Sequence, residues 1–150
     1  MKRFLFCLLA LILIYLGTTV IGPRTPISVE PFVVEDIRAI TKAQLLYSLT
    51  KGRGQFTDLT TLAGAGLIDP ALASGEKNGY LFATQAVEGR SMMFDVIARP
   101  AGGEAVQTRA HSYYSNERAV QDVYKIEGGE PAEVTQEDRV PKRGILVREE

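Results

Sequence analysis

The stretch from Val33 to Leu49 constrains the fold of this chain more than any other segment. At about 100° per residue its apolar side chains gather on one face of a helix, while Glu35, Arg38 and Lys42 lie on the opposite face. Polar residues also lie inside the apolar face: Thr41, Gln44 and Ser48. Each needs a hydrogen-bond partner if it is buried, because an unpaired buried polar group costs roughly 1–3 kcal/mol. The stretch therefore predicts one long helix that covers a core.

Further along the chain, the apolar residues recur with a period of two, which is typical of strands. Tyr80 to Gln85 and Met92 to Arg99 predict one hairpin, and Arg109 to Ser115 and Ala119 to Ile126 predict a second. The residues expected to face the helix are Phe82, Phe94, Ala110, Ser112, Tyr114, Val120, Tyr124 and Ile126. Four antiparallel strands with one face against one helix predict a two-layer α+β domain with a meander sheet.

The N-terminal segment has the pattern of a membrane-spanning or signal helix. Lys2 and Arg3 precede Phe4 to Ile21, an uncharged apolar run of eighteen residues, which is just long enough to cross a bilayer. Gly17 and Val20 are poor cleavage positions, which favours an uncleaved anchor over a cleaved signal peptide. Because the positive end stays inside, both alternatives place the rest of the chain outside the cytoplasm.

These patterns divide the chain into four parts. Residues 1–21 form the anchor or signal segment, and residues 22–31, with three prolines, form a stiff linker. Residues 32–127 form the α+β domain. Residues 128–150 are rich in charge and predict a disordered tail, with the alternative that Ile145 to Val147 docks on a sheet edge.

Capping residues, glycines and a proline predict where the helical segments begin and end. Gly52 is expected to end the long helix in a left-handed conformation. Thr57 is expected to cap a short helix from Asp58 to Ala63. Asp69, followed by Pro70, predicts the start of a further helical turn, which Gly75 closes.

Several short motifs resemble those of type IV pilin-like proteins and type II secretion pseudopilins. Ala43, Gln44, Tyr47 and Gly52 match the phrase that ends the long helix in these families. The segments Gly66 to Pro70 and Lys77 to Tyr80 match the phrase before their first long strand, and SYYSNERAVQDV matches the end of their meander. The resemblance covers about Ile37 to Ile126 and implies a pilin-like fold.

The resemblance stops before the N-terminus, where the prepilin leader pattern is absent. We therefore expect a pilin-like domain on an ordinary anchor: a single-pass protein of a bacterial inner membrane that faces the periplasm or exterior, or else a protein secreted after signal cleavage. The resemblance implies a structural or assembly role through other pilin-like or secretion-system proteins. The alternative is an extracytoplasmic module that binds or senses a small ligand.

The chemistry-bearing residues predict no enzyme. His111 is the one histidine, Cys7 lies in the apolar run, and the loop from Arg99 to Thr108 has one acid, Glu104. We therefore expect no catalytic residue, cofactor or metal site. A net charge of −1 also argues against a nucleic-acid partner. Partner-contact candidates on the exposed helix face are Arg38, Lys42 and Leu46.

Overall fold

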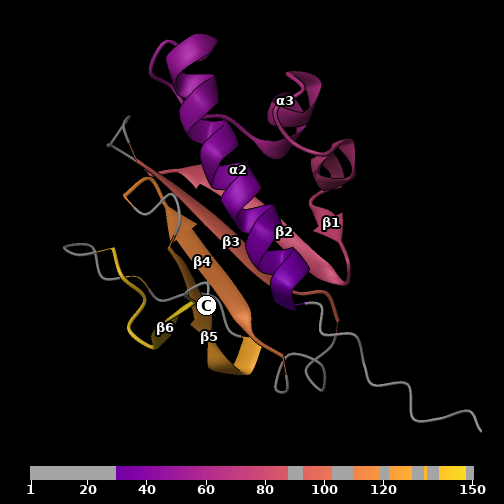
Figure 1. The fold of residues 1–150 in the computed structure, drawn as a ribbon, viewed down its shortest axis with the longest axis vertical. Helices are drawn as coiled ribbons and strands as arrows, with labels where there is room; N and C mark the ends of the chain where they lie inside the picture. Colours follow the sequence, from indigo (N-terminus) through magenta and orange to yellow (C-terminus); the bar gives the residue numbers. More distant parts are fainter. Residues whose placement is uncertain are drawn as a thin grey trace, which may run out of the picture.

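The computed structural model describes residues 30–87, 93–102, 110–118, 122–129, 134 and 139–147. Helix α2 (Glu30–Thr50) lies across one face of a single antiparallel sheet, in which the strands follow the order of the chain (Figure 1). The strands are β1 (Glu76–Lys77), β2 (Tyr80–Ala86), β3 (Phe94–Pro100), β4 (Ser112–Asn116), β5 (Val123–Ile126) and β6 (Gly144–Val147). The shorter helices are α3 (Leu59–Gly64), η1 (Pro70–Ser74) and η2 (Glu127–Gly129).

The prediction of a four-stranded sheet is wrong, because the sheet of the described structure has six strands. β1 is two residues long, too short to show alternation, and β6 is surrounded by charged residues that resemble a tail. Yet β6 pairs with β5, so residues 144–147 are not disordered. No helix in the described ranges is long and apolar enough to cross a membrane, and the predicted anchor, residues 1–21, lies outside them.

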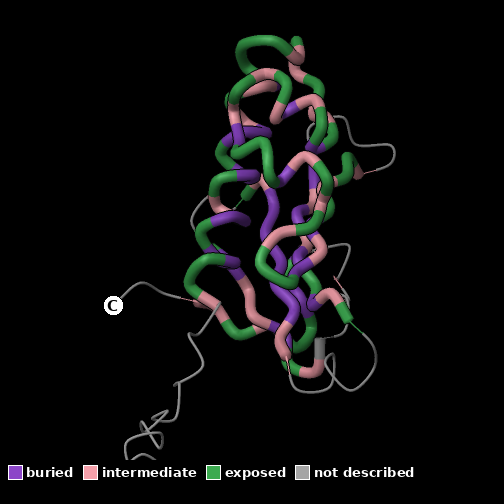
Figure 2. Tube along the Cα trace, turned by 90° about the vertical axis from the view of Figure 1, so that its right-hand side faces the viewer, coloured by how far each residue is buried: buried purple, intermediate pink, exposed green. Residues whose placement is uncertain are grey.

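The core lies between α2 and the sheet, and Figure 2 shows the buried residues gathered along this layer. Val33, Ile37 and Ile40 of α2 are completely buried, as are Phe94 and Val96 of β3. Strand β2 contributes Tyr80 and Phe82, and the two small helices contribute Leu62 and Leu72. The helical period and the period-two pattern of β2 and β3 thus meet in one core, as the sequence predicts for these elements.

In β4 and β5, the side chains predicted to face the helix lie on the other side of the sheet. Ala98 faces the helix and pairs with Tyr113, so Tyr113 joins the core, while Tyr114 faces the other side of the sheet. All five residues of β4 are buried, on both faces. Alternation therefore cannot identify which face of β4 meets the helix, and a one-residue error in register reverses every side chain.

Thr41, Gln44 and Ser48, the polar residues predicted to lie inside the apolar face of α2, have the partners that their burial requires. The hydroxyls of Thr41 and Ser48 donate to the carbonyls of Ile37 and Leu45, at 2.9 and 2.8 Å. Gln44 reaches farther: its Nε2 donates to the Thr57 carbonyl and to Thr84 Oγ1, and its Oε1 accepts from Thr57 N at 3.0 Å. Gln44 thus ties α2 to the following loop and to β2.

The helix ends differ in detail from the prediction. Asp58, not Thr57, caps α3, whereas Asp69 caps η1 and Gly75 closes it with a φ of 76°, as predicted. Gly52 does not have a positive φ; the residues after it, Arg53 and Gly54, do. Gly52 is instead constrained by space, since a Cβ there would lie 2.3 Å from the carbonyl oxygen of Gln55 and 2.8 Å from the ring of Tyr47.

Candidate functional site

The three predicted contact residues lie along one side of α2 but differ in exposure. Arg38 is half-buried on the flank that faces β5 and β6, whereas Lys42 is exposed and Leu46 is 48% exposed. The structure therefore separates them into two neighbouring regions: Lys42 and Leu46 on the outward face of the helix, and Arg38 beside a groove.

The outward face of α2 carries a mixed row of apolar and charged side chains. Six of the exposed residues on this face, between the two ends of the helix, are named here the outward stripe: Phe32, Glu35, Ala39, Lys42, Leu46 and Leu49. At 100° per residue they fall within an arc of about 100°, opposite the core. Phe32, Leu46 and Leu49 are 50%, 48% and 84% exposed, and they are three of the five large apolar residues that are exposed in the described structure.

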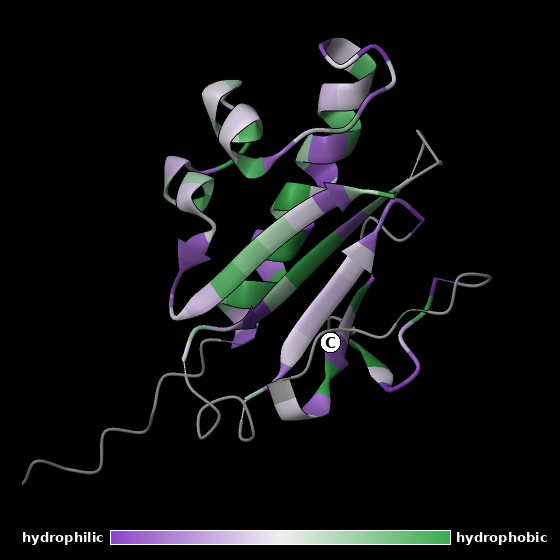
Figure 3. Cartoon of the chain, turned by 180° about the vertical axis from the view of Figure 1, so that it is seen from behind, coloured by the Kyte–Doolittle hydropathy of each residue, from purple (hydrophilic) through white to green (hydrophobic). Residues whose placement is uncertain are grey.

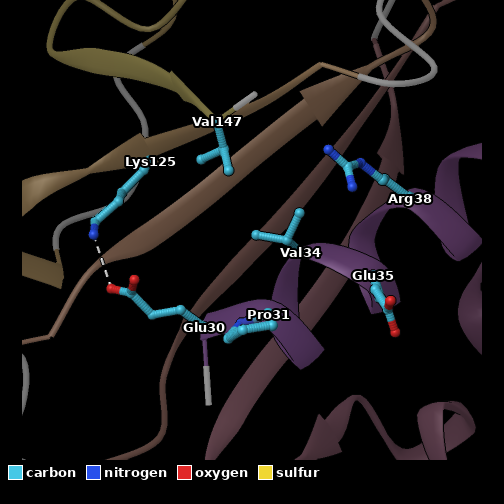
Figure 4. Close-up of a pocket in the computed structure, with 7 residues that line it drawn as sticks. All are labelled: Glu30, Pro31, Val34, Glu35, Arg38, Lys125 and Val147. Carbon is cyan, nitrogen blue, oxygen red and sulfur yellow. Dashed lines mark ion pairs between the residues drawn. The ribbon is translucent and has the colours of Figure 1, made fainter. Parts of the chain in front are cut away.

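A groove of about 390 Å³ lies between the first half of α2 and strands β5 and β6 (Figure 4). Val34 and Val147 point toward each other across it. Glu30 and Lys125 close one end with an ion pair of 2.9 Å, and Arg38 stands toward the other end. The groove is therefore partly open, with an apolar middle and charged ends.

The Glu30 carboxylate connects the start of α2 to the sheet. Glu30 Oε1 lies 2.9 Å from Lys125 Nζ and 2.9 Å from His111 Nδ1. The hydrogen bond from Lys125 lowers the pKa of Glu30, partial burial opposes this, and the charge of Lys125 adds to the lowering. His111 thus lies at a corner that joins the start of α2 to the sheet.

Two tyrosines lie under this corner. The rings of Tyr80 and Tyr113 are 5.9 Å apart, and both are buried. Burial raises the pKa of each phenol, and the negative charge of Glu30 raises it further. Both tyrosines therefore stay protonated at neutral pH. A protonated phenol cannot accept a proton from a substrate, so neither tyrosine is suited to act as a general base.

The opposite face of the sheet, seen in Figure 3, carries a second group of buried charges. Arg139 is 4% exposed, and its guanidinium forms ion pairs with Asp95 and, at 3.1 Å, with Glu117. It also donates to the carbonyl of Phe94 at 2.8 Å. Arg139, from the segment before β6, thereby binds β3 and the end of β4.

Tyr114 and Asn116 complete this Arg139 cluster. Tyr114 donates from its hydroxyl to Asp95 Oδ1 at 2.6 Å and accepts from Asn116 Nδ2 at 3.2 Å. Asn116 Nδ2 also donates to the backbone carbonyl of Arg139 at 2.9 Å. Burial, then the bond to Asp95, raises the pKa of Tyr114 to about 12. The paired charges and satisfied donors indicate a structural role: the cluster fixes the C-terminal segment on the sheet.

The sequence analysis predicted neither the ion pairs of Glu30 nor those of the Arg139 cluster. Glu30 precedes the predicted domain boundary, and Arg139 lies in the predicted tail, far in sequence from Asp95 and Glu117. Asp95 alone gave a signal, as an acid in a strand whose neighbours are apolar. The described residues contain no group of three or more His, Cys, Asp or Glu side chains that could hold a metal ion.

No protein-family model, curated protein or solved structure gives a significant match to this chain. The resemblance to pilin-like proteins therefore stays a prediction from short motifs, and the described site has to be interpreted from its own geometry.

Proposed function

We propose that this chain is a non-enzymatic, membrane-attached protein with a structural or assembly role outside the cytoplasm, exerted through contacts with other proteins. The outward stripe is the observation that carries this proposal. Its apolar members are exposed on the same helix that already buries its opposite face in the core. Exposed apolar side chains that gather on one surface are typical of protein-interaction sites.

The motifs that resemble pilins and pseudopilins support the same proposal. They suggest that the partners are pilin-like or secretion-system proteins, and the apolar segment from Phe4 to Ile21 suggests the attachment to a bacterial inner membrane. The groove beside Arg38 supports the alternative, a module that binds a small ligand. We favour the contact role because the groove is partly open to solvent, whereas small-molecule sites bury most of their ligand.

Site-specific photocrosslinking from the full-length chain in its native membrane tests the contact role. A photoreactive residue at position 46 should form protein adducts, and Leu49→Glu in the same chain should reduce their yield. The matched control places the photoreactive residue at Gln85, which is exposed on β2. Equal adducts from positions 46 and 85, or none from either, would contradict the proposal.

A further inference from the structure

The outward stripe has a spacing of seven residues. Phe32, Ala39 and Leu46 are seven residues apart, and Glu35, Lys42 and Leu49 form a second such series. Since a seven-residue step returns to nearly the same side of a helix, with a drift of about 20°, these six residues form a seam along α2. Such a seam is suited to packing against another helix.

The charges on the seam distinguish between the possible partner helices. A second copy of α2, parallel and in register, would place Glu35 against Glu35 and Lys42 against Lys42, which is repulsive at both positions. An antiparallel second copy would place Glu35 against Lys42 twice. The charge pattern is therefore self-complementary only when the helix direction is reversed.

The apolar members of the stripe fit the same antiparallel arrangement. Ala39 lies midway between Phe32 and Leu46, so a two-fold axis at Ala39 places Phe32 of one copy opposite Leu46 of the other. The midpoint of Glu35 and Lys42 differs from Ala39 by half a residue, which is less than about 1 Å along the helix. The small side chain of Ala39 at the axis permits the close approach of about 8–10 Å that packed helices need.

We propose that the outward stripe is the interface with a second copy of this chain, with the two α2 helices antiparallel about a two-fold axis at Ala39. This rests on the proposed contact function and names its partner. The stripe has one acid and one base, so it offers no net charge to a polyanion or an anionic lipid surface. Its contacts are instead complementary to themselves, as an isologous interface requires.

Cysteine crosslinking of the full-length chain in native membranes tests the orientation. In a Cys7→Ser background, co-expressed Glu35→Cys and Lys42→Cys chains should form the mixed disulfide in several-fold excess over either self-linked dimer. Dominant self-linked dimers would overturn the antiparallel arrangement. A yield no higher than that of Gln85→Cys, the exposed control on β2, would overturn self-association through α2.

Charge reversal adds a readout that does not depend on cysteine. For the detergent-solubilised full-length chain, Glu35→Lys or Lys42→Glu alone should weaken the dimer about tenfold by sedimentation, because two attractive pairs become repulsive. The combined Glu35→Lys and Lys42→Glu variant should restore it. No weakening by the single changes would contradict the pairing.

The two proposals can fail separately. Adducts from position 46 to a different protein, without the mixed disulfide, would overturn the second-copy interface and leave the contact role standing. Absence of any adduct from position 46 would overturn both.

Discussion

The two faces of the sheet are buried by different means. The face toward α2 is covered by Val33, Ile37 and Ile40, and its own side chains are mostly apolar. The opposite face, at β3 and β4, is covered through Arg139, whose guanidinium forms ion pairs with two carboxylates. Tyr113 and Tyr114 are adjacent in β4, yet they belong to these two different environments.

The difference concerns how each face responds to the loss of a side chain. An apolar core loses transfer free energy and gains a cavity when a side chain is shortened. A buried ion-pair cluster is destabilised when one charge is removed, because the remaining charges are left desolvated and unpaired. The apolar face should therefore tolerate changes of shape better than changes of size, and the Arg139 cluster should tolerate simultaneous neutralisation better than a single one.

The largest effect is expected from Phe94→Ala on the helix-facing side. Phe94 is completely buried, and its ring centroid lies 4.6 Å from that of Phe56. The change should lower the free energy of unfolding by about 3–5 kcal/mol in urea denaturation. Gln85→Ala, at an exposed position of β2 outside the outward stripe, is the control and should change it by less than about 0.5 kcal/mol. A loss below about 1 kcal/mol at Phe94 would show that this side of β3 is not the core.

A smaller loss is expected from Arg139→Met on the other face. The change leaves Asp95 and Glu117 without their cation, but these side chains keep 18% and 13% exposure, so water partly solvates them. We expect a loss of about 2–3 kcal/mol, below the range for a fully buried pair. Arg143→Ala, at an exposed position three residues before Leu146, should have little effect.

Neutralising the whole cluster tests whether the loss comes from unpaired charge. Arg139→Met combined with Asp95→Asn and Glu117→Gln should recover at least about 1 kcal/mol relative to Arg139→Met alone. If the triple variant is less stable than the single variant, the cluster depends on its hydrogen-bond geometry more than on charge balance.

Truncation after Gly129 removes Arg139 and β6 together, and it should lower the melting temperature.

Sequence periodicity predicted the helix-facing side because its signals are local. The helical stripe of α2 and the alternation in β2 and β3 each lie within one element, and Asp69, Pro70 and Gly75 mark η1 within six residues. The Arg139 cluster had no such signal. It joins β3 and β4 to a residue that follows Asp95 by 44 positions, and its three ionic members belong to residue types that usually lie at the surface. Burial on both faces of β4 then removed the alternation that would have fixed its register.

The candidate contact residues show the same limit. The helical period could predict that Lys42 and Leu46 face outward, because that depends on α2 alone. It could not predict that Arg38 borders a groove, since the far wall of that groove is Val147 of β6.

The adjacent tyrosines of β4 sharpen the comparison with the same substitution on each face. Tyr114→Phe removes the 2.6 Å hydrogen bond to Asp95 and should cost about 1–2 kcal/mol. Tyr113→Phe should be neutral or slightly stabilising, because the buried Tyr113 hydroxyl has no partner in hydrogen-bond geometry among the described atoms. Urea denaturation of the two variants measures both values. A cost for Tyr113→Phe equal to that of Tyr114→Phe would show that the Tyr113 hydroxyl does donate a hydrogen bond, with the Glu30 carboxylate as the acceptor.

The smallest effect is expected at the Glu30 corner, and it depends on pH. The hydrogen bond from Lys125 lowers the pKa of Glu30 below its ordinary value of 4.5, with burial opposing and the charges of Lys125 and His111 also lowering it. A carboxylate with a lowered pKa in the folded state stabilises that state at pH above the unfolded pKa, and this contribution is lost as the pH falls through the folded pKa.

Since Glu30 is 40% exposed, solvent screens the pair, and Glu30→Gln should cost only about 0.5 kcal/mol at pH 7. The difference between wild type and Glu30→Gln should shrink as the pH falls below 4.5, and it should vanish once the pH is well below the lowered pKa of Glu30. A difference that does not change with pH would mean that Glu30 stabilises the start of α2 by packing instead of by charge, and the corner would then resemble the apolar face of the sheet more than the Arg139 cluster.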